Sequence, residues 1–336
     1  MSATNKSIFI TGANGYIAKH IIKQALANGY SVVGTVRSAE KGEALAKLVN
    51  SDKFSYEVVE GVDHKGAYDQ PLKNHPEVSV LLHTASPVNY YATDPLNETI
   101  LPAINGVKEL FDSIKANAAQ IEKVVLTTSV MAIAKIVNFQ IIGVNHTEAD
   151  WSPITIEEGK TDGALAYAAS KKFEEQAAWK YVEVEKRNFT LTTVAPTFAV
   201  GPQAYDEDAS APASTSGMIA GLLSLTPSGY VYPFAGNFVD VRDVAKAHIL
   251  GFELDDAQGK RLIAGGENFN FHKTIEVIQK HFPDYKGKLP AVDSTQMPPE
   301  TPFINNKKTN DTLGFEFIDI ESSIIDQLNQ FFSAGK

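Results

Sequence analysis

Two residues of one expected helix have the spacing that proton transfer to a carbonyl oxygen requires. Tyr167 and Lys171 stand four residues apart in the alanine-rich segment 164–173, so they share one face of that helix. A tyrosine with its ordinary pKa of about 10 exchanges protons slowly at neutral pH, and a lysine cation beside it lowers that pKa. Because this spacing is common in soluble helices, where the tyrosine can equally be a core aromatic, the rest of the chain must decide.

A serine hydroxyl is expected beside this pair. The segment 123–128 has the pattern of a buried strand, and Ser129 stands at its carboxyl end, where a parallel sheet presents ligands. A hydroxyl there can hold a carbonyl oxygen while Tyr167 delivers the proton. Ser129, Tyr167 and Lys171 are therefore the predicted catalytic group, and the reaction that they fit is the reduction of a carbonyl by hydride.

A glycine-containing turn between an expected strand, 7–11, and an expected helix, 15–28, predicts where the hydride donor binds. Gly12 permits a tight turn, Gly15 lets the backbone approach a pyrophosphate, and Ala18 keeps the helix close to the sheet. The spacing is G-x-x-G-x-x-A. Because the turn follows a strand and opens a helix, we expect a dinucleotide here rather than an empty turn.

The end of the second strand, 31–36, indicates which dinucleotide. An NAD site usually has an acidic residue there, but this chain has Arg37, with Lys41 one helical turn further on. Arg37 can form a bidentate contact with a 2′-phosphate, and Lys41 adds a point charge. The alternative is a solvated basic patch at a helix start. We predict NADPH as the cofactor.

Two later segments fit the same ligand. Asp63 could accept a hydrogen bond from the adenine amino group, although a solvated loop aspartate is the alternative. The small residues of 83–87 would allow close backbone approach to the middle of the cofactor. His83 itself is interpreted as a packed histidine at a strand end. The histidine spacing is not that of zinc ligands, so no metal site is predicted.

The elements that position these residues alternate between strands and helices. Continuous apolar strands separated by helices predict an α/β fold with a doubly wound parallel Rossmann sheet. Residues 1–202 and 238–265 are assigned to this dinucleotide-binding domain. Residues 203–237 and 266–336 do not continue this alternation of strands and helices, and they are assigned to a smaller C-terminal substrate-binding lobe. The remaining expected strands are 56–60, 78–83 and 189–194, and the other expected helices are 39–49, 98–116, 272–282 and 320–333.

Composition excludes several classes of function. A net charge of −10 and a pI near 5.3 argue against nucleic-acid binding and against docking on anionic membranes, both of which need clustered positive charge. The absence of cysteine excludes disulfides, thiolate catalysis and cysteine-bound metals. No apolar stretch is long enough to span a bilayer and no secretion signal is recognised, so we expect a cytoplasmic protein.

Together these motifs resemble the extended short-chain dehydrogenases/reductases. The subgroup that the chain resembles most is that of fungal NADPH-dependent aldehyde/ketone reductases (methylglyoxal and isovaleraldehyde reductase-like), which are related to plant dihydroflavonol and cinnamoyl-CoA reductases. The resemblance covers nearly the whole chain and implies the same Ser-Tyr-Lys group. It is carried by the segments 11–18, 36–41, 83–87, 102–108, 126–129, 167–171, 195–203, 239–248 and 313–315.

The resemblance also implies contacts around the reaction centre. It places Pro196 and Phe198 by the nicotinamide carboxamide and Thr215 and Ser216 near the cofactor. From the motifs and the resemblance together, the predicted cofactor contacts are Gly12, Asn14, Gly15, Tyr16, Ile17, Arg37, Lys41, Asp63, Thr84, Ala85, Ser86, Thr127, Tyr167, Lys171, Pro196, Phe198, Thr215 and Ser216.

The implied substrate pocket contains Val88, Val130, Met131 and Phe198. Relatives often have aromatic residues at the positions of Val88 and Val130. We therefore expect a roomier, more aliphatic pocket that accepts bulky ketones.

Two alternatives stay open beside an NADPH-dependent carbonyl reductase. A sugar-nucleotide epimerase or dehydratase normally retains NAD, which Arg37 disfavours, and it must grip a diphosphate, whereas 203–237 contains no Arg or Lys. A non-enzymatic NADP(H)-sensing protein would commonly have lost the tyrosine–lysine pair. The expected partner is a small-molecule carbonyl substrate, and the expected assembly is a monomer or homodimer. Asp240, Arg242 and Asp243 are interpreted as ion-paired support where the lobe joins the sheet.

Overall fold

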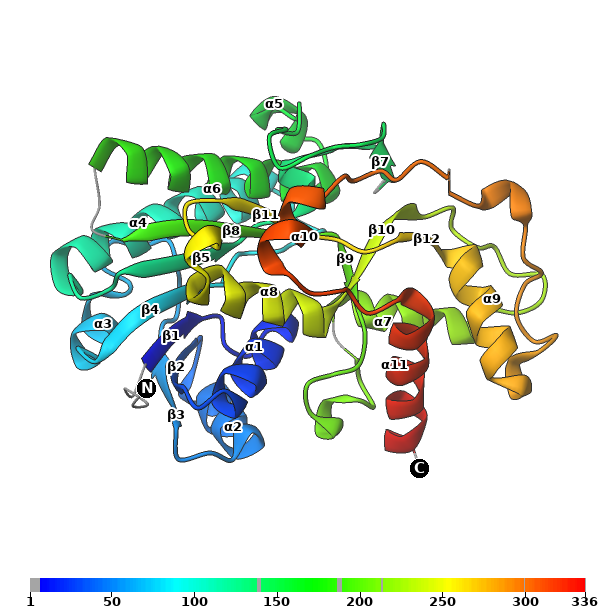
Figure 1. Cartoon of the computed structure of the whole chain (residues 1–336), viewed down its shortest axis with the longest axis horizontal. Helices are drawn as coiled ribbons and strands as arrows, with labels where there is room; N and C mark the ends of the chain where they lie inside the picture. The colour runs from blue at the N-terminus through cyan, green and yellow to red at the C-terminus, as the bar shows by residue number, and fades with distance from the viewer. Residues whose placement is uncertain (1–6, 138–139, 186–188, 213, 299, 336) are drawn as a thin grey trace.

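The computed structural model describes residues 7–137, 140–185, 189–212, 214–298 and 300–335. Within these residues, seven parallel strands form one sheet in the order β3–β2–β1–β4–β5–β8–β11 (Figure 1). The predicted doubly wound α/β fold is therefore confirmed. The strands of this sheet are β1 (Ser7–Thr11), β2 (Ser31–Val36), β3 (Phe54–Val58), β4 (Val78–His83), β5 (Lys123–Thr127), β8 (Thr190–Pro196) and β11 (Arg261–Ala264).

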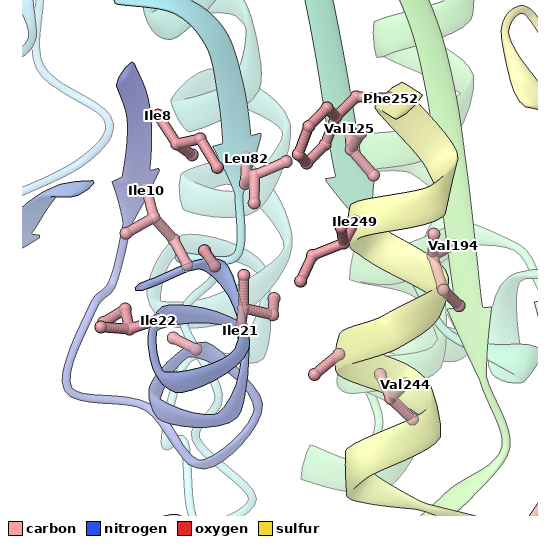
Figure 2. Packing of buried hydrophobic residues seen from close by; sticks show 14 of the residues in the cluster. Ile8, Ile10, Ile21, Ile22, Leu82, Val125, Val194, Val244, Ile249 and Phe252 are labelled. Carbon is pink, nitrogen blue, oxygen red and sulfur yellow. The ribbon is translucent and has the colours of Figure 1, made fainter. Parts of the chain in front are cut away.

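Successive residues of each strand point to opposite faces of the sheet, so apolar side chains lie on both faces. Helices cover both faces and bury these side chains. Ile8 and Ile10 of β1 pack with α1 (Tyr16–Ala27), α2 (Ala39–Val49) and α8 (Val241–Glu253), whereas Phe9 packs with α3 (Asp69–Asn74), α4 (Leu101–Asn117) and α6 (Gly163–Glu185). Figure 2 shows side chains of α1 and α8 beside those of β1, β4, β5 and β8 on the first face. Among the described residues, no helix is long and apolar enough to cross a membrane.

Element boundaries follow the sequence pattern closely in this sheet. β2, α2 and β4 begin and end where the pattern places them, whereas β3 is Phe54–Val58 rather than 56–60 because it pairs with β2 from Phe54 onward. The helix expected at 98–116 begins as a π-helical turn, Leu96–Ile100, before α4, which has Pro102 in its first turn. The pattern did not predict α3.

A second, smaller sheet lies beside the first. Its strands are β9 (Phe198–Val200), β10 (Ala235–Asp240) and β12 (Asn268–Asn270). α7 (Ser214–Gly221), α9 (Phe271–His281) and α11 (Ile320–Ala334) pack around it in the right half of Figure 1. Within 238–265, β11 joins the large sheet and α8 covers it, but β10 belongs to the smaller sheet. The predicted domain boundaries stay predictions.

Other short elements connect these parts. An antiparallel pair of strands, β6 (Lys135–Val137) and β7 (Gln140–Ile142), follows the short helix Val130–Ala132. The remaining helices are α5 (Ile156–Gly159), α10 (Lys307–Leu313) and the 3-10 turns Asp206–Asp208, Leu222–Ser224, Asp255–Ala257, Pro283–Tyr285 and Ser294–Gln296.

The start of α8 is tied to α11 by charge. The buried carboxylate of Asp240 accepts hydrogen bonds from Arg242 at 2.8 Å and from the Ser323 hydroxyl at 2.7 Å. Arg242 also pairs with Asp326 at 2.8 Å. The carboxylate of Asp243 accepts the backbone N–H that precedes α11. The predicted ion-paired support is confirmed for Asp240 and Arg242, whereas Asp243 supports the junction through a backbone hydrogen bond.

Candidate active site

The site begins where the order of the large sheet reverses, between β1 and β4, which is where doubly wound sheets bind ligands. Thr11 holds the two strand ends together: its hydroxyl is 2.8 Å from Nδ1 of His83 and accepts the backbone N–H groups of Thr84 and Ala85, each at 3.1 Å. Burial, and then the charge of Lys171, lower the pKa of His83 to about 3. The ring is therefore uncharged and packed, as predicted.

Gly12 brings the turn after β1 against the loop after β4. It has a left-handed φ of 67°, and a Cβ at this position would lie 2.9 Å from the Cα of Ala85. A side chain would therefore meet backbone on the opposite loop as well as strain the turn. The two loops approach closely because residue 12 is glycine.

The turn then opens α1, where a helix leaves its first N–H groups without intrahelical partners. Gly15 caps the helix without a side chain, and Tyr16 and Ile17 supply the first N–H groups. The Tyr16 hydroxyl donates to the carbonyl of Gly201 at 2.7 Å, so its side chain holds a neighbouring loop. Asn14 is exposed. These backbone groups fit a pyrophosphate.

Basic side chains stand at the end of β2. Arg37 and Lys41 are both exposed at the start of α2, whose cap is Ser38. Thr35 connects them to the glycine turn, because its hydroxyl accepts the Gly12 N–H at 3.2 Å. Asp63 is an exposed residue after β3. Positive charge thus lies just beyond the end of β2, next to the predicted pyrophosphate turn, where a 2′-phosphate would need it.

Ser129 and Tyr167 meet at the carboxyl end of β5. Ser129 caps the turn Val130–Ala132 by accepting the N–H of Met131 at 3.2 Å. Tyr167 reaches it from α6, which begins where the Asp162 carboxylate accepts two backbone N–H groups. Burial raises the pKa of the Tyr167 hydroxyl, and the nearby Ser129 hydroxyl lowers it. The two hydroxyl groups therefore lie close enough to interact.

Lys171 lies one helical turn beyond Tyr167 and is buried. Its Nζ donates to the carbonyl of Thr127 at 3.3 Å and to Oε2 of Glu174 at 2.9 Å. The adjacent Lys172 instead donates to the carbonyl of Ile154 at 2.7 Å. Of these two lysines, therefore, it is Lys171 whose amine contacts the end of β5.

Several other predicted cofactor contacts use their polar groups elsewhere. The Thr127 hydroxyl is 2.7 Å from Nε2 of His248 on α8, so only its backbone faces Lys171. The Thr215 hydroxyl donates to the carbonyl of Ala199. Ser216 is buried in the smaller part of the molecule, where its hydroxyl accepts from Gln203 at 2.6 Å.

The predicted pocket residues lie in different surroundings. Val88 is 52% exposed on the loop after β4. Val130 is buried in a cluster with Ile133 and Ile141, and Met131 packs against a separate cluster on α6. At the junction of the two sheets, Pro196 is buried at the end of β8. Phe198 follows on β9 and stacks on Phe269, with ring centroids 5.1 Å apart.

Sequence reasoning missed three residues near the predicted catalytic group. The ring of Tyr90 meets that of Tyr167 edge-on, with centroids 5.7 Å apart. Gly163, at the start of α6, allows this because a Cβ there would lie 2.0 Å from the Tyr90 carbonyl oxygen. Glu174 is the buried partner of Lys171. Only Glu174 left a signal, since its spacing of three residues from Lys171 is typical of helical ion pairs.

Across the part of the chain that the structure describes, no three acidic or histidine side chains gather as they would around a metal ion.

Comparison with known proteins gives a consistent result. The model of the NAD dependent epimerase/dehydratase family matches residues 8–265. The chain is 36% identical to the NADPH-dependent methylglyoxal reductase of Saccharomyces cerevisiae, over 96% of this chain and 97% of that protein. It is 34% identical to a ketoreductase of Aspergillus niger, over 97% of each. The crystal structure of yeast methylglyoxal/isovaleraldehyde reductase complexed with NADPH superposes with a TM-score of 0.92 at 36% identity, covering 97% of this chain and 98% of that one.

Proposed function

The chain belongs to the NAD dependent epimerase/dehydratase family, and from that premise we propose that it is an NADPH-dependent oxidoreductase that reduces aldehydes and ketones to alcohols. The observation that carries this proposal is that the Ser129 and Tyr167 hydroxyls lie close together at the end of β5, where the amine of the buried Lys171 also lies. Relatives over the full length of the chain that are named NADPH-dependent methylglyoxal reductase and ketoreductase support the carbonyl as the group acted on.

The residues at the reversal of the sheet fit NADPH. The N–H groups of Tyr16 and Ile17 would hold the pyrophosphate, and the close approach at Gly12 would let it lie against the backbone. Arg37 and Lys41 would neutralise the 2′-phosphate. When bound there, NADPH supplies the hydride that reduces the carbonyl carbon.

The side chains at the end of β5 handle the proton. The Ser129 hydroxyl donates a hydrogen bond to the carbonyl oxygen and fixes its position. As negative charge develops on that oxygen, the O–H bond of Tyr167 breaks and its proton moves to the oxygen, which gives the alcohol. The Lys171 cation stabilises the tyrosinate that remains. Tyr167 must regain a proton before the next turnover.

The substrate class is proposed more broadly than any single compound. Val88, Val130 and Met131 are aliphatic, and we predict that bulky ketones are accepted beside small aldehydes. Kinetics in which only the smallest carbonyl compounds are reduced would contradict this. A monomeric or homodimeric state and a cytoplasmic location stay predictions.

Replacing Tyr167 with phenylalanine tests the proposal. The Tyr167→Phe variant should lose turnover by about a hundredfold or more, because the proton donor is removed, while NADPH binding stays nearly unchanged. Oxidation of NADPH with a panel of aldehydes, α-dicarbonyls, β-keto esters and aryl ketones measures the first quantity, and fluorescence titration with NADPH the second. Turnover like that of the wild type in this variant would contradict the proposed mechanism.

A further inference from the structure

The buried carboxylate of Glu174 is the charged partner of Lys171. Its side chain is almost completely inaccessible, and Oε2 accepts from the Lys171 Nζ at 2.9 Å. A buried pair of this kind is well compensated only when both charges are present, so the charge of either side chain depends on the other. The carboxylate therefore acts on the same amine that the proposed mechanism uses.

The charge of Glu174 changes the pKa values of other groups in the site. Burial raises the pKa of Glu174, whereas Lys171 and the Ser86 hydroxyl lower it and the neighbouring Glu175 raises it. The charge of Glu174 in turn raises the pKa of Tyr167, and it adds to burial in raising that of Tyr68. The Tyr167 hydroxyl is thus exposed to the negative charge of Glu174, which opposes its ionisation.

Glu175, the next residue on α6, gives a contrast within the same turn. It is equally buried, but its carboxylate accepts from Arg261 at 2.7 Å and from the hydroxyls of Thr193 at 2.8 Å and Thr128 at 3.1 Å. These partners come from β11, β8 and the end of β5, so Glu175 ties α6 to the large sheet. Glu174 has its ion pair with Lys171 instead.

We propose that Glu174 is a positioning residue of the reaction: its carboxylate holds the Lys171 amine at the end of β5, and its charge offsets part of the lysine's effect on Tyr167. This inference rests on the proposed carbonyl reductase function. Its consequence is that the pH at which Tyr167 loses its proton depends on a residue that contacts neither the carbonyl nor the cofactor.

The sharpest variant is Glu174→Gln, which keeps the size of the side chain and an oxygen that can accept from Lys171 but removes the negative charge. Loss of that charge favours tyrosinate, so the pKa of Tyr167 should fall by about one pH unit. Oxidation of an alcohol needs the tyrosinate, and its rise with pH should therefore move to lower pH. Reduction needs the protonated tyrosine, so its alkaline decline should also begin at lower pH.

A titration without substrate or cofactor measures the same quantity directly. The ultraviolet absorbance of tyrosinate is followed against pH in the wild type and in Tyr167→Phe, and the difference between the two curves is the titration of Tyr167. The same pair of curves is recorded on the Glu174→Gln background. The matched control is Glu175→Gln, which should lower thermal stability but leave the midpoint of Tyr167 in place. If that control does not fold, Glu174→Asp, which retains the charge, should keep the wild-type midpoint.

The outcomes separate this inference from the proposed function. A lower Tyr167 midpoint and shifted pH profiles in Glu174→Gln, with both unchanged in the control, support it. An unchanged midpoint and unchanged profiles in a folded Glu174→Gln variant overturn it. Failure of the wild type to reduce any carbonyl would overturn the proposed function instead, and the absorbance titration would still report whether Glu174 acts on Tyr167.

Discussion

The two sides of the candidate site are built differently. On the cofactor side, Thr11, His83 and the N–H groups of the next loop form a closed set of hydrogen bonds, and Gly12 brings the loops into backbone contact. On the proposed substrate side, the loop after β4 reaches α6 through the ring of Tyr90 and the gap that Gly163 provides. The next residue, Tyr91, is 93% exposed.

This contrast between the two sides indicates where the specificity of the site can change. A ligand bound mainly by backbone N–H groups and a helix terminus depends on chain geometry, which few substitutions can alter without strain. A pocket walled by side chains from a loop can change with a single residue while the sheet stays intact. We therefore expect cofactor-side substitutions to be severe and substrate-side substitutions to alter selectivity.

The largest effect should come from Gly12→Ala. Because the new Cβ would collide with Ala85 and φ is left-handed, NADPH affinity should fall by about a hundredfold or more. The matched control is Gly29→Ala, which has a similar left-handed φ of 89° but open space around its Cβ. It should cost about 1–2 kcal/mol of stability and leave NADPH binding unchanged. If both variants lost NADPH affinity equally, backbone strain rather than the close approach of the two loops would explain the loss.

An intermediate effect is expected from Arg37→Ala. Removing a charge-assisted contact to the 2′-phosphate should raise the KM for NADPH about tenfold to a hundredfold and that for NADH hardly at all. Steady-state kinetics with both cofactors measure this, and Lys47→Ala, an exposed lysine further along α2, controls for the change in net charge. A similar rise in KM for both cofactors would show that Arg37 does not recognise the 2′-phosphate.

The smallest effect, and the one that tests the substrate side, should come from Tyr90→Ala. An aromatic contact of this kind contributes about 0.5–1.5 kcal/mol, so the KM for bulky ketones should change by several-fold while NADPH affinity does not. Tyr91→Ala, in the same loop but at a residue that is 93% exposed against 45% for Tyr90, should behave like the wild type. A fall in NADPH affinity for Tyr90→Ala would place this ring on the cofactor side and contradict the division of the site into two sides.

Much of the large sheet was predictable because its strands are continuous apolar runs bounded by turns. The segments 31–36 and 78–83 match β2 and β4 at both ends. The smaller sheet was not predictable in the same way. β9 and β12 are only three residues long, and their pairing with β10 joins segments far apart in the sequence. Local pattern carries no information on such pairing.

The candidate site divides in the same manner. Ser129, Tyr167 and Lys171 were predictable from the order of strand, helix and spacing, and the structure places them together, although their catalytic roles stay predictions. Thr127 was expected to contact the cofactor, but the direction of its hydroxyl, toward His248, depends on which face of β5 each side chain takes. Tyr90 could not be predicted, since its place depends on how a loop without regular structure folds over α6.

The arrangement of the smaller sheet has a consequence for how the protein is made. Phe198 and Phe234 leave the ribosome well before Phe269 and Phe271, the rings on which they stack. Between those moments the segment that becomes β11 and α8 is also synthesised, so the large sheet can close while these aromatic rings are still uncovered. Exposed apolar surface at that stage favours aggregation. A chain interrupted just before β12 should therefore be a substrate for chaperones, even though every strand of its larger sheet is already present.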